Sequence, residues 1–424
     1  MSKVFKIIPT TQQYDWGKQG RQSKVFQLAV SSQIPSFQQL DESKPYAELW
    51  MGTHPTSPSH VSTDASSSVK LSEHLKKHPE LIGNAVSAKF PDGKEGNLPF
   101  LFKVLSIQKA LSIQTHPDKP TAEKLHAERP DIYKDPNHKP ELALALTPFR
   151  ALCGFQPLPN IAHNLQNTPE LAALIPSSIL DAFLQASGSH WDGAALEAKQ
   201  ALRDLFAAIM TVPKEEVTKQ VRKLVERYQA TSDAIEKEMV LRLNEQFPDD
   251  IGILCVFLLN HVTLQPGEAI FLGAGEPHAY VDGDIIECMA NSDNVIRAGL
   301  TPKLIDVPNL VSGLTYVPGE PGRHKVTPSS FPESSQSSAS TLYDPPIPEF
   351  SVVQVKLKGS QESHPAVPGP SIVVVVQGQG TVKWEGDRLE IKNGDVFFIG
   401  ADTGVEFAST GGDELVMYRA YVVA

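Results

Sequence analysis

Two short segments of this chain place metal-binding types of side chain at the spacing of a β-strand. The first reads LSIQTH and carries Ser112, Gln114 and His116 two residues apart. The second reads ELALAL and begins with Glu141. Because successive side chains on a strand point to opposite faces, each segment has one polar or small-residue face and one leucine- or isoleucine-containing face. An imidazole, a carboxylate and an amide oxygen facing one cavity indicate a metal site that lacks a ligand.

A later segment offers the missing ligand. Residues 262–280 read as a strand, a turn and a further strand that carries His278 and Tyr280 on one face. A lone histidine in such a strand is ordinarily a hydrogen-bonded core residue. The complementary set around Gln114 and His116 favours His278 as the fourth metal ligand.

The same segment recurs near the C-terminus. GEAIFLGAGEPHAY and GDVFFIGADTGVEF begin at Gly267 and Gly394, and this alignment places His278 opposite Val405. A β module present twice is typical of cupin-type jelly rolls. The pattern predicts that the first copy binds metal and that the second copy is structural and metal-free.

Charged residues in two other segments suggest an anion near the metal. Lys103 interrupts the apolar run 97–107, so its side chain either reaches an edge or meets an anion. Arg297 and Lys303 lie in a polar, non-periodic segment. That segment is either a solvated loop or a clamp over a phosphate or an oxyanion.

The elements that hold these residues fall into three predicted units. Strand patterns predominate over 1–157 and 251–320, which form the predicted catalytic β domain. Residues 158–250 have helical spacing and predict an insertion of about four to six helices with no chemistry of its own. A Pro- and Ser-rich surface connection, 319–348, leads into the metal-free C-terminal β domain, 321–424. The predicted fold is mainly β with a helical insertion, built from two cupin-type (jelly-roll) β-barrels plus an α-helical domain.

Composition and charge limit the partners. The 424 residues are 41% hydrophobic and 21% charged, as in ordinary globular proteins, and the formal net charge is −11. That charge argues against nucleic acid or an anionic membrane as the main partner. Three cysteines without CxxC spacing predict a reducing compartment, and no signal peptide or membrane span is apparent. We therefore expect a cytoplasmic protein.

Five ordered motifs resemble those of the type I mannose-6-phosphate isomerase (phosphomannose isomerase) family of the cupin superfamily. They read YDWG, LSIQTHPDK, NHKPELALAL, GEPHAY and GDIIECMANSDNVIRAGLTPK, beginning at Tyr14, Leu111, Asn137, Gly275 and Gly283. The helical block lies where the family has one. No functional position departs from the family pattern.

The resemblance implies a zinc site and a set of pocket residues. One zinc ion per chain would be held by Gln114, His116, Glu141 and His278. The implied catalytic residues are Arg297, Glu287, Lys139 and His138. The implied substrate-binding residues are Ser112, Lys103, Tyr280, Asp293, Lys303 and Trp16, with Ser112 and either Lys103 or Lys303 contacting a phosphate.

The implied reaction interconverts mannose 6-phosphate and fructose 6-phosphate through a cis-enediol intermediate, supplying mannose 6-phosphate for GDP-mannose synthesis and glycosylation. Such chemistry needs a base beside a carbonyl and a fixed cation for the enediolate. Glu287, His138 and Lys139 remain open as the base. The small Ala143 and Ala145 beside Glu141 are expected to leave space for the sugar, and the chain is expected to act as a monomer.

Two other classes of function share these features. A non-catalytic cupin that senses sugar phosphates or metals would keep the same pocket without turnover. A metal-dependent dioxygenase would use a His-rich iron site with open positions. The Gln ligand and the nearby cations favour the isomerase.

Overall fold

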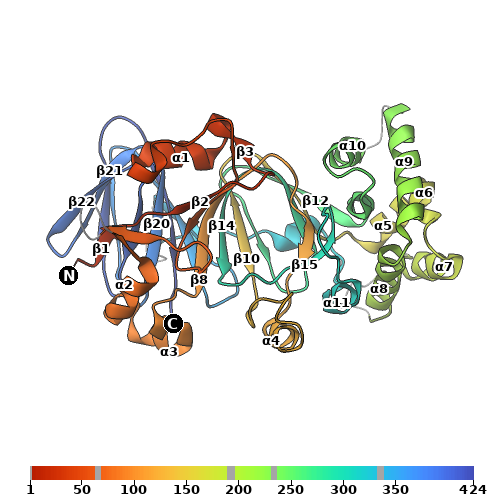
Figure 1. The fold of residues 1–424 in the computed structure, drawn as a ribbon, viewed down its shortest axis with the longest axis horizontal. Coiled ribbons are helices and arrows are strands. Elements are labelled where there is room, and N and C mark those ends of the chain that lie inside the picture. Colours follow the sequence, from red (N-terminus) through yellow and green to blue (C-terminus); the bar gives the residue numbers. More distant parts are fainter. Residues whose placement is uncertain (1, 63–67, 189–195, 231–235, 332–338) are drawn as a thin grey trace.

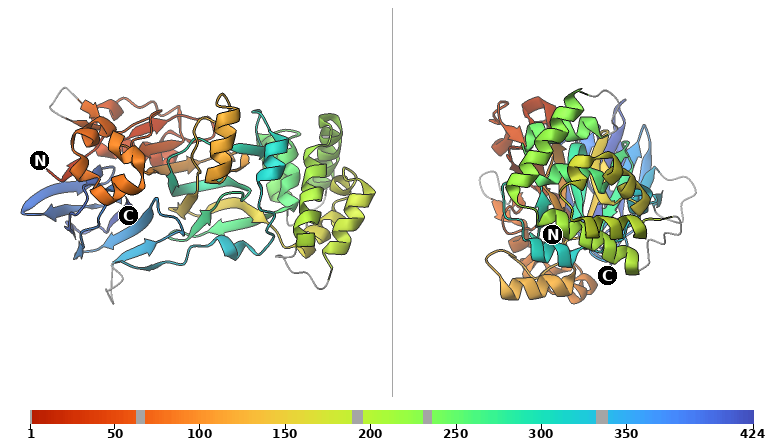
Figure 2. Two further views of the ribbon diagram at one scale, coloured as in Figure 1. Left: turned by 90° about the horizontal axis from the view of Figure 1, so that it is seen from below. Right: turned by 90° about the vertical axis from the view of Figure 1, so that its right-hand side faces the viewer.

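The computed structural model describes residues 2–62, 68–188, 196–230, 236–331 and 339–424. Its strands gather in two β units that lie side by side, and most of its helices lie beyond one of them (Figure 1). The molecule is elongated, with both termini toward the end opposite to helices α5 to α10 (Figures 1 and 2).

The first β unit is a ten-stranded sheet in the order β12-β11-β14-β8-β5-β2, with β9, β10, β13 and β15 paired off this path. Its strands are β2 (Thr10–Gln12), β5 (Glu48–Met51), β8 (Phe100–Ile107), β9 (Ile113–Thr115), β10 (Glu141–Ala145), β11 (Phe149–Phe155), β12 (Leu259–Leu264), β13 (Ala269–Leu272), β14 (His278–Ala290) and β15 (Ile296–Gly299). Strand β14 organises this unit because it pairs with β8, β9, β10 and β11. The strands predicted at Gln114, Glu141 and His278 are confirmed and lie in one sheet.

The second β unit combines a seven-stranded sheet, β1-β23-β20-β25-β18-β17-β16, with a four-stranded sheet, β19-β24-β21-β22. Its strands are β1 (Val4–Lys6), β16 (Ser329–Ser330), β17 (Ser340–Tyr343), β18 (Ser351–Leu357), β19 (Gln361–His364), β20 (Ser371–Gln377), β21 (Gln379–Trp384), β22 (Asp387–Lys392), β23 (Val396–Ile399), β24 (Val405–Ser409) and β25 (Leu415–Tyr421). Short paired strands β3 (Lys18–Gln19) with β4 (Pro45–Tyr46), and β6 (His60–Ser62) with β7 (Ser68–Lys70), lie outside both units.

Two segments differ from the expectation. Strand β1 pairs with β23, so the first strand of the chain joins the C-terminal sheet rather than the sheet of the predicted catalytic domain. The stretch 319–348 is more than a surface connection, because it contains β17, which pairs with β18. Most side chains of β17 are buried. The serine run at 334–338 lies outside the described residues.

The two units repeat one pattern of strand pairing. Strand β10 pairs with β13 and β14 as β20 pairs with β23 and β25. Glu141 lies opposite Leu272, and Ser371 lies opposite Ile399. Leu272 and Ile399 occupy the same position in the two aligned segments. The repeat seen in the sequence is therefore a repeat of structure, in which Ser371 takes the place of Glu141.

This equivalence places a buried cation in the second unit. The matching residues, first unit then second, are Gln114 and His364, Glu141 and Ser371, His278 and Val405, and Glu287 and Arg419. Arg419 is fully buried. Its Nε donates to Ser371 Oγ at 3.0 Å, and its Nη1 lies 3.2 Å from His364 Nδ1. A guanidinium thus contacts the counterparts of two first-unit metal candidates.

Six described helices occupy the predicted insertion, in agreement with the expected four to six. They are α5 (Leu158–Asn167), α6 (Pro169–Ala172), α7 (Ser177–Ala186), α8 (Leu196–Met210), α9 (Lys214–Ala230) and α10 (Lys237–Gln246). The apolar face of α9 is buried at Val217, Val221, Leu224 and Tyr228. These side chains share one hydrophobic core with residues of β11, β14 and β15. The helices therefore pack against the strands that carry His278 and Arg297.

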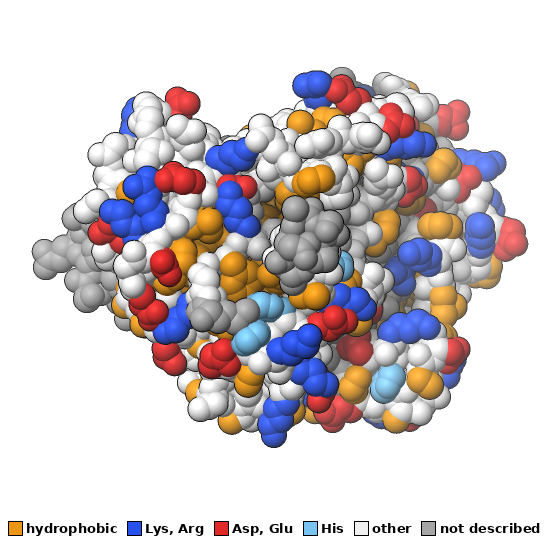
Figure 3. Space-filling model, turned by 60° about the vertical axis from the view of Figure 1, so that its left-hand side comes forward, with side chains coloured by type: hydrophobic (Ala, Val, Ile, Leu, Met, Phe, Trp, Pro, Cys, Tyr) orange, Lys and Arg blue, Asp and Glu red, His pale blue; other side chains and the backbone are white. Residues whose placement is uncertain are grey.

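The remaining helices are short. They are α1 (Lys24–Ser32), α2 (Leu71–Lys77), α3 (Asn84–Lys89), α4 (Lys119–Glu128) and α11 (Val307–Gly313). In the described ranges, no helix has both the length and the hydrophobicity that crossing a lipid bilayer requires. Acidic and basic side chains are interspersed over the face drawn in Figure 3, which shows no broad patch of one sign.

Candidate metal centre and adjoining cavity

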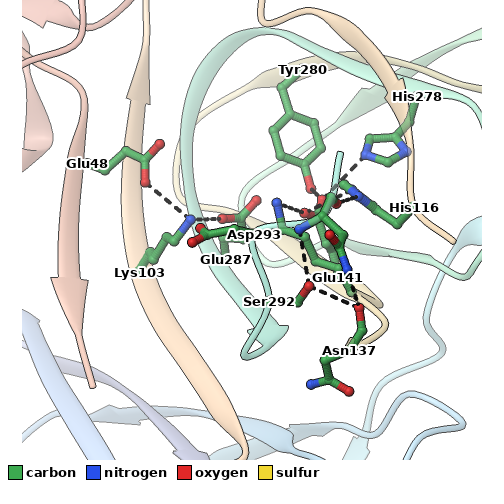
Figure 4. A network of polar contacts seen from close by, with 12 residues as sticks. Glu48, Lys103, His116, Asn137, Glu141, His278, Tyr280, Glu287, Ser292 and Asp293 are labelled. Atoms are coloured by element: carbon green, nitrogen blue, oxygen red, sulfur yellow. Dashed lines mark hydrogen bonds and ion pairs between the residues drawn. The ribbon is translucent and has the colours of Figure 1, made fainter. Parts of the chain in front are cut away.

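His116, Glu141 and His278 meet inside the first β unit. They form the one group of three metal-ligand residue types among the described residues, with one ligand atom from each within 4.8 Å of the others. His116 Nε2 lies 3.2 Å from Glu141 Oε1, and His278 Nε2 lies 3.4 Å from Glu141 Oε2. All three side chains are buried, and Figure 4 shows them pointing toward one another.

Hydrogen bonds prepare both imidazoles for a metal. His116 Nδ1 lies 2.7 Å from the Asn294 carbonyl oxygen, and His278 Nδ1 lies 2.9 Å from the Glu276 carbonyl oxygen. A carbonyl only accepts, so each Nδ1 carries the hydrogen and each Nε2 keeps a lone pair. Neither buried Nε2 has a hydrogen-bond partner, since its contact with Glu141 lacks hydrogen-bond alignment. Two buried lone pairs facing a carboxylate fit a divalent cation.

Burial and neighbouring charges set the protonation states that a metal needs. Burial lowers the pKa of His116 to about 4, although Glu141 opposes the shift. Burial also acts to raise the pKa of Glu141, but Lys139 and the two histidines outweigh it and hold that pKa well below its ordinary value. Near neutral pH the site therefore offers a neutral His116 imidazole and a charged Glu141 carboxylate.

Gln114 links this group to Arg297. In the sheet Gln114 lies opposite His278 on one side and opposite Arg297 on the other. Side chains at directly paired positions share a face. The amide of Gln114 and the guanidinium of Arg297 are therefore placed on the same face as a metal-group histidine.

A cavity of about 650 Å³ opens beside Gln114. Five residues predicted from the sequence line it, namely Trp16, Ser112, Gln114, Arg297 and Lys303. The helical insertion also contributes to the wall, through Lys214 and residues 246–250. We expected the insertion to carry no chemistry of its own, and its part in the cavity wall was not predicted.

Four cations line the cavity without an ionic partner. They are Lys109, Lys214, Arg297 and Lys303, and across the described ranges none has a carboxylate oxygen within 4.0 Å. Burial lowers the pKa of Arg297. Unpaired cations around a cavity attract an anion, and phosphate oxygens are suitable acceptors for them.

Three of the four acids on the same wall, which also carries Asp15, are already engaged. Asp249 forms an ion pair with Arg222 at 2.7 Å. Asp250 accepts the Gly252 N–H at the start of the 3₁₀ helix that follows it, and also the N–H groups of Leu300 and Thr301. Glu48 binds Lys103, so these acids do not neutralise the four cations.

Lys103 resolves the alternatives that the sequence left open, because it meets anions. Its Nζ lies 3.2 Å from Glu48 Oε2 and 3.1 Å from Glu287 Oε2 (Figure 4), and the ring of Trp50 lies 4.7 Å away. Burial opposes its charge, but Glu48, Glu287 and Glu141 outweigh burial and raise the pKa of Lys103. The expected phosphate contact of Lys103 is therefore corrected, since two carboxylates already hold its ammonium group.

The three candidate bases have different surroundings. None of them lies on the cavity wall. His138 Nε2 lies 2.5 Å from Glu349 Oε1, so this imidazole faces a residue near the second β unit. Lys139 Nζ lies 3.2 Å from Glu141 Oε1. Burial raises the pKa of Glu287 against the opposing effect of Lys103.

Other predicted residues have a supporting position. The Tyr280 hydroxyl donates to Glu141 Oε2 at 3.1 Å, and Asp293 Oδ1 lies 3.4 Å from His54 Nε2. Ala143 and Ala145 pack in a hydrophobic cluster with Phe149 and Tyr280 and do not line the cavity. The expectation that these alanines make room for a sugar was wrong, because their face is closed by core side chains.

Glu48 and the cations Lys109 and Lys214 were missed by sequence reasoning. Glu48 had a usable signal, since it is an acid within the apolar strand ELWM and could have been matched with Lys103. Lys109 and Lys214 had none, because lysines in loops and at helix starts are ordinary surface residues.

Comparison with known proteins agrees with this geometry. Family models described as phosphomannose isomerase type I match in three parts, with the catalytic domain over residues 4–158, the helical insertion domain over 183–259 and the C-terminal part over 340–387. A mannose-6-phosphate isomerase of Cryptococcus neoformans is 51% identical, and one of Saccharomyces cerevisiae is 43% identical; each alignment covers 99% of both chains.

A solved mannose 6-phosphate isomerase from Salmonella typhimurium, described as bound to its substrate and to zinc, superposes with a TM-score of 0.82 at 33% identity over 100% of both chains. A zinc-bound mannose 6-phosphate isomerase superposes with a TM-score of 0.81 at 34% identity, also over 100% of both chains. The chain belongs to the type I phosphomannose isomerase family.

Proposed function

We propose that this protein is a zinc-dependent aldose–ketose isomerase that interconverts mannose 6-phosphate and fructose 6-phosphate through a cis-enediol. The observation that carries the proposal is the juxtaposition of the His116–Glu141–His278 group with a cavity lined by unpaired cations. A sugar phosphate has hydroxyl and carbonyl oxygens for a metal at one end and a phosphate for the cations at the other. Relatives named mannose-6-phosphate isomerase support the same substrate class.

The proposed zinc ligands are Nε2 of His116 and His278, the Glu141 carboxylate and the Gln114 amide oxygen. When bound, zinc supplies a Lewis acid that polarises oxygens of the sugar. Tyr280 donates a hydrogen bond to Glu141 and so helps to orient that ligand.

The cations of the chain have two proposed roles, at the enediol oxygen and at the phosphate. Arg297, on the same face as Gln114, stabilises the negative charge that develops on an enediol oxygen. Lys303 and Ser112 bind the phosphate, with Lys109 and Lys214 adding charge to the same wall. Trp16 forms part of the wall beside Tyr14, its ring centroid 5.9 Å from that of Tyr14.

Glu287 is the proposed proton-transferring base. A base works best when its pKa lies near the working pH, and burial raises the pKa of this carboxyl. Lys103 holds the Glu287 carboxylate in place. His138 and Lys139 are less suited as the base. His138 is held by Glu349, and Lys139 forms an ion pair with Glu141.

At the scale of the chain, the proposal includes two cupin-type barrels, of which the first binds metal. It includes the predicted domain bounds of 1–157 with 251–320, 158–250 and 321–424. We further propose a cytoplasmic monomer whose product, mannose 6-phosphate, supplies GDP-mannose synthesis and glycosylation.

A dioxygenase is the second candidate, because two histidines and one carboxylate are also the ligand set of non-haem iron oxygenases. The unpaired cations and the Gln114 amide beside that set favour a sugar phosphate. Oxygen consumption on loading with Fe(II), without isomerase turnover, would support the dioxygenase.

The deciding experiment is a coupled assay for fructose 6-phosphate formed from mannose 6-phosphate by the full chain. Chelation should abolish turnover, and zinc should restore it. Full turnover in a metal-stripped sample would contradict the zinc requirement. Binding of fructose 6-phosphate without any turnover by the zinc-loaded chain would instead indicate a sugar-phosphate sensor.

A further inference from the structure

We propose that Asp135 is a positioning residue for the metal centre, acting through the loop of residues 291–295. The inference rests on the metal centre proposed above. Asp135 is neither a member of the metal group nor part of the cavity wall. Its contacts nevertheless join the segment that leads to Glu141 with the loop whose Asn294 carbonyl oxygen lies against His116.

The Asp135 carboxylate accepts hydrogen bonds from both segments. Oδ1 accepts from the Asn137 backbone N–H at 2.9 Å and from Ser292 Oγ at 2.8 Å. Oδ2 accepts from the Asp293 backbone N–H at 2.7 Å. The Asp135 carbonyl oxygen accepts from Asn294 Nδ2 at 2.6 Å. One residue therefore binds three consecutive residues of the loop; Figure 4 shows Ser292, Asp293 and Asn137 close together.

The loop carries a group on which the metal centre depends. The Asn294 carbonyl oxygen accepts from His116 Nδ1 and so sets which nitrogen of that ring faces the site. The side chain of Asp293 contacts His54. The loop joins β14 to β15, and β15 carries Arg297. A shift of this loop would therefore turn the His116 ring and move Arg297.

On its other side Asp135 precedes the residues that complete the site. Asn137 is followed by Lys139 and then by Glu141 at the start of β10. The Asn137 carbonyl oxygen also accepts from Asn294 Nδ2 at 2.9 Å. Asp135 thus fixes the distance between the segment of Glu141 and the loop that orients His116.

The loop requires such a support for physical reasons. Residues 291–295 have no strand pairing, whereas Ser292 and Asn294 are buried. Buried donors that lack acceptors destabilise the conformation that buries them. Asp135 supplies the acceptors, and it does so with a charged carboxylate, which forms stronger hydrogen bonds than a neutral oxygen.

His278 has a separate support, which makes the inference specific. Its Nδ1 partner is the Glu276 carbonyl oxygen, and the Glu276 side chain is held by Thr315 and Arg323. Within the described part of the chain, no hydrogen bond joins that group to Asp135. Loss of the Asp135 carboxylate should therefore disturb His116 and leave the hydrogen bond of His278 in place.

The test compares Asp135→Asn with Asp131→Asn in the full chain. The amide nitrogen of Asn cannot accept the hydrogen bond from the Asp293 N–H, so part of the hydrogen bonding of the Asp135 carboxylate is lost. Asp131 lies four residues earlier, is exposed and pairs with the neighbouring Arg129, which makes it the matched control. Zinc affinity is measured by competition with a chelator, and the site geometry by the visible spectrum of the Co²⁺-loaded protein.

Asp135→Asn should bind zinc roughly 10–100-fold more weakly, the range seen when outer supports of metal ligands are lost. Its Co²⁺ spectrum should differ from the wild type, and zinc should raise its unfolding temperature less than it raises that of the wild type. Asp131→Asn should match the wild type in all three. A role in general stability alone would instead lower the unfolding temperature equally with and without metal, and would overturn the inference.

Wild-type zinc affinity and Co²⁺ spectrum in Asp135→Asn would also overturn it. If Asp135→Asn does not fold, Ser292→Ala removes the hydrogen bond of Ser292 Oγ to Asp135 and the bond that Ser292 Oγ accepts from the Asn294 N–H, while the other bonds of Asp135 remain, and it should weaken zinc binding by a smaller factor. Unchanged affinity in that variant would then count against the inference. Failure of the wild-type chain to bind zinc would refute the proposed metal centre instead, so the two failures are distinguishable.

Discussion

Arg297 is a partly buried side chain whose charge no described carboxylate neutralises within 4.0 Å. Burial lowers its pKa, so keeping a cation at this position costs the folded chain stability. Residues that are unfavourable for folding and line a cavity are typical of functional sites. Stability and activity should therefore respond in opposite ways to its removal.

Arg297→Ala should reduce kcat at least about 100-fold, because it removes a cation placed for developing negative charge. The free energy of unfolding should stay within about 1 kcal/mol of the wild type or rise, since no ion pair is lost. Steady-state kinetics and urea unfolding measure the two effects. Arg388→Ala, an exposed arginine paired with Glu390 in the second β unit, should leave both unchanged. Unchanged kinetics in Arg297→Ala would remove it from its proposed role.

At the residue scale, the metal group was largely predictable from the sequence. Strand alternation placed Gln114 with His116, and the repeat singled out His278 because Val405 stands in the second copy. Asp135 could not be found in this way, because its role depends on contacts between segments far apart in the chain, which the local sequence does not encode. Glu48 stood out as an acid within an apolar strand and was nevertheless not matched with Lys103.

The three strands β5, β8 and β14 together hold one buried charged row. Lys103 lies opposite Trp50 in β5 and opposite Glu287 in β14. Glu48 reaches the same ammonium from β5. The neighbouring side chains of these strands are apolar. The buried charges are therefore stable only while they are paired with one another.

Lys103→Met should lower the free energy of unfolding by about 3–5 kcal/mol, because Glu48 and Glu287 would remain buried without a cation. Glu48→Gln in the same chain should recover part of that loss. Chemical denaturation of the single and double variants measures both. Lys356→Met, at an exposed position of β18, should change stability by less than about 0.5 kcal/mol. A Lys103→Met protein as stable as the wild type would show that the two carboxylates simply take up protons.

Element positions were more predictable than element partners. The strands at Gln114, Glu141 and His278 follow from side-chain alternation, and the helices within 158–250 follow from periodicity; both match the structure. The pairing of β1 with β23 does not follow, because the interacting residues Val4 and Ile399 are nearly the whole chain apart. The same limit explains why Lys103 suggested an anion without identifying Glu48 and Glu287.

Across the whole molecule, buried neutral histidines should make the fold sensitive to acid. Burial lowers the pKa of His324, in the segment between the two β units, to about 4, against an ordinary value of 6.5. The pKa of His324 is lower in the folded state than in the unfolded state. Its full contribution to the free energy of unfolding is therefore present above pH 6.5 and is lost as the pH falls toward 4. His116 responds in the same direction in the absence of metal.

The free energy of unfolding should therefore fall between about pH 6.5 and pH 4, by an amount of order 2–3 kcal/mol from His324 alone. His324→Gln, which cannot titrate, should show a smaller loss over this interval even if it is less stable at about pH 7. Urea unfolding of both proteins at the two ends of the interval gives the comparison. Equal losses in the two proteins would exclude His324 as a contributor.

Arg419 gives the duplicated pattern of strands a different meaning in each half. In the first half, two imidazoles and a carboxylate form a group that would bind a metal ion taken from solution. In the second half, the guanidinium between Ser371 and His364 is part of the polypeptide, and no chelator or scarcity of metal can remove it. The first copy of the pattern thus takes its cation from solution, whereas the second copy has its cation within the polypeptide, in Arg419.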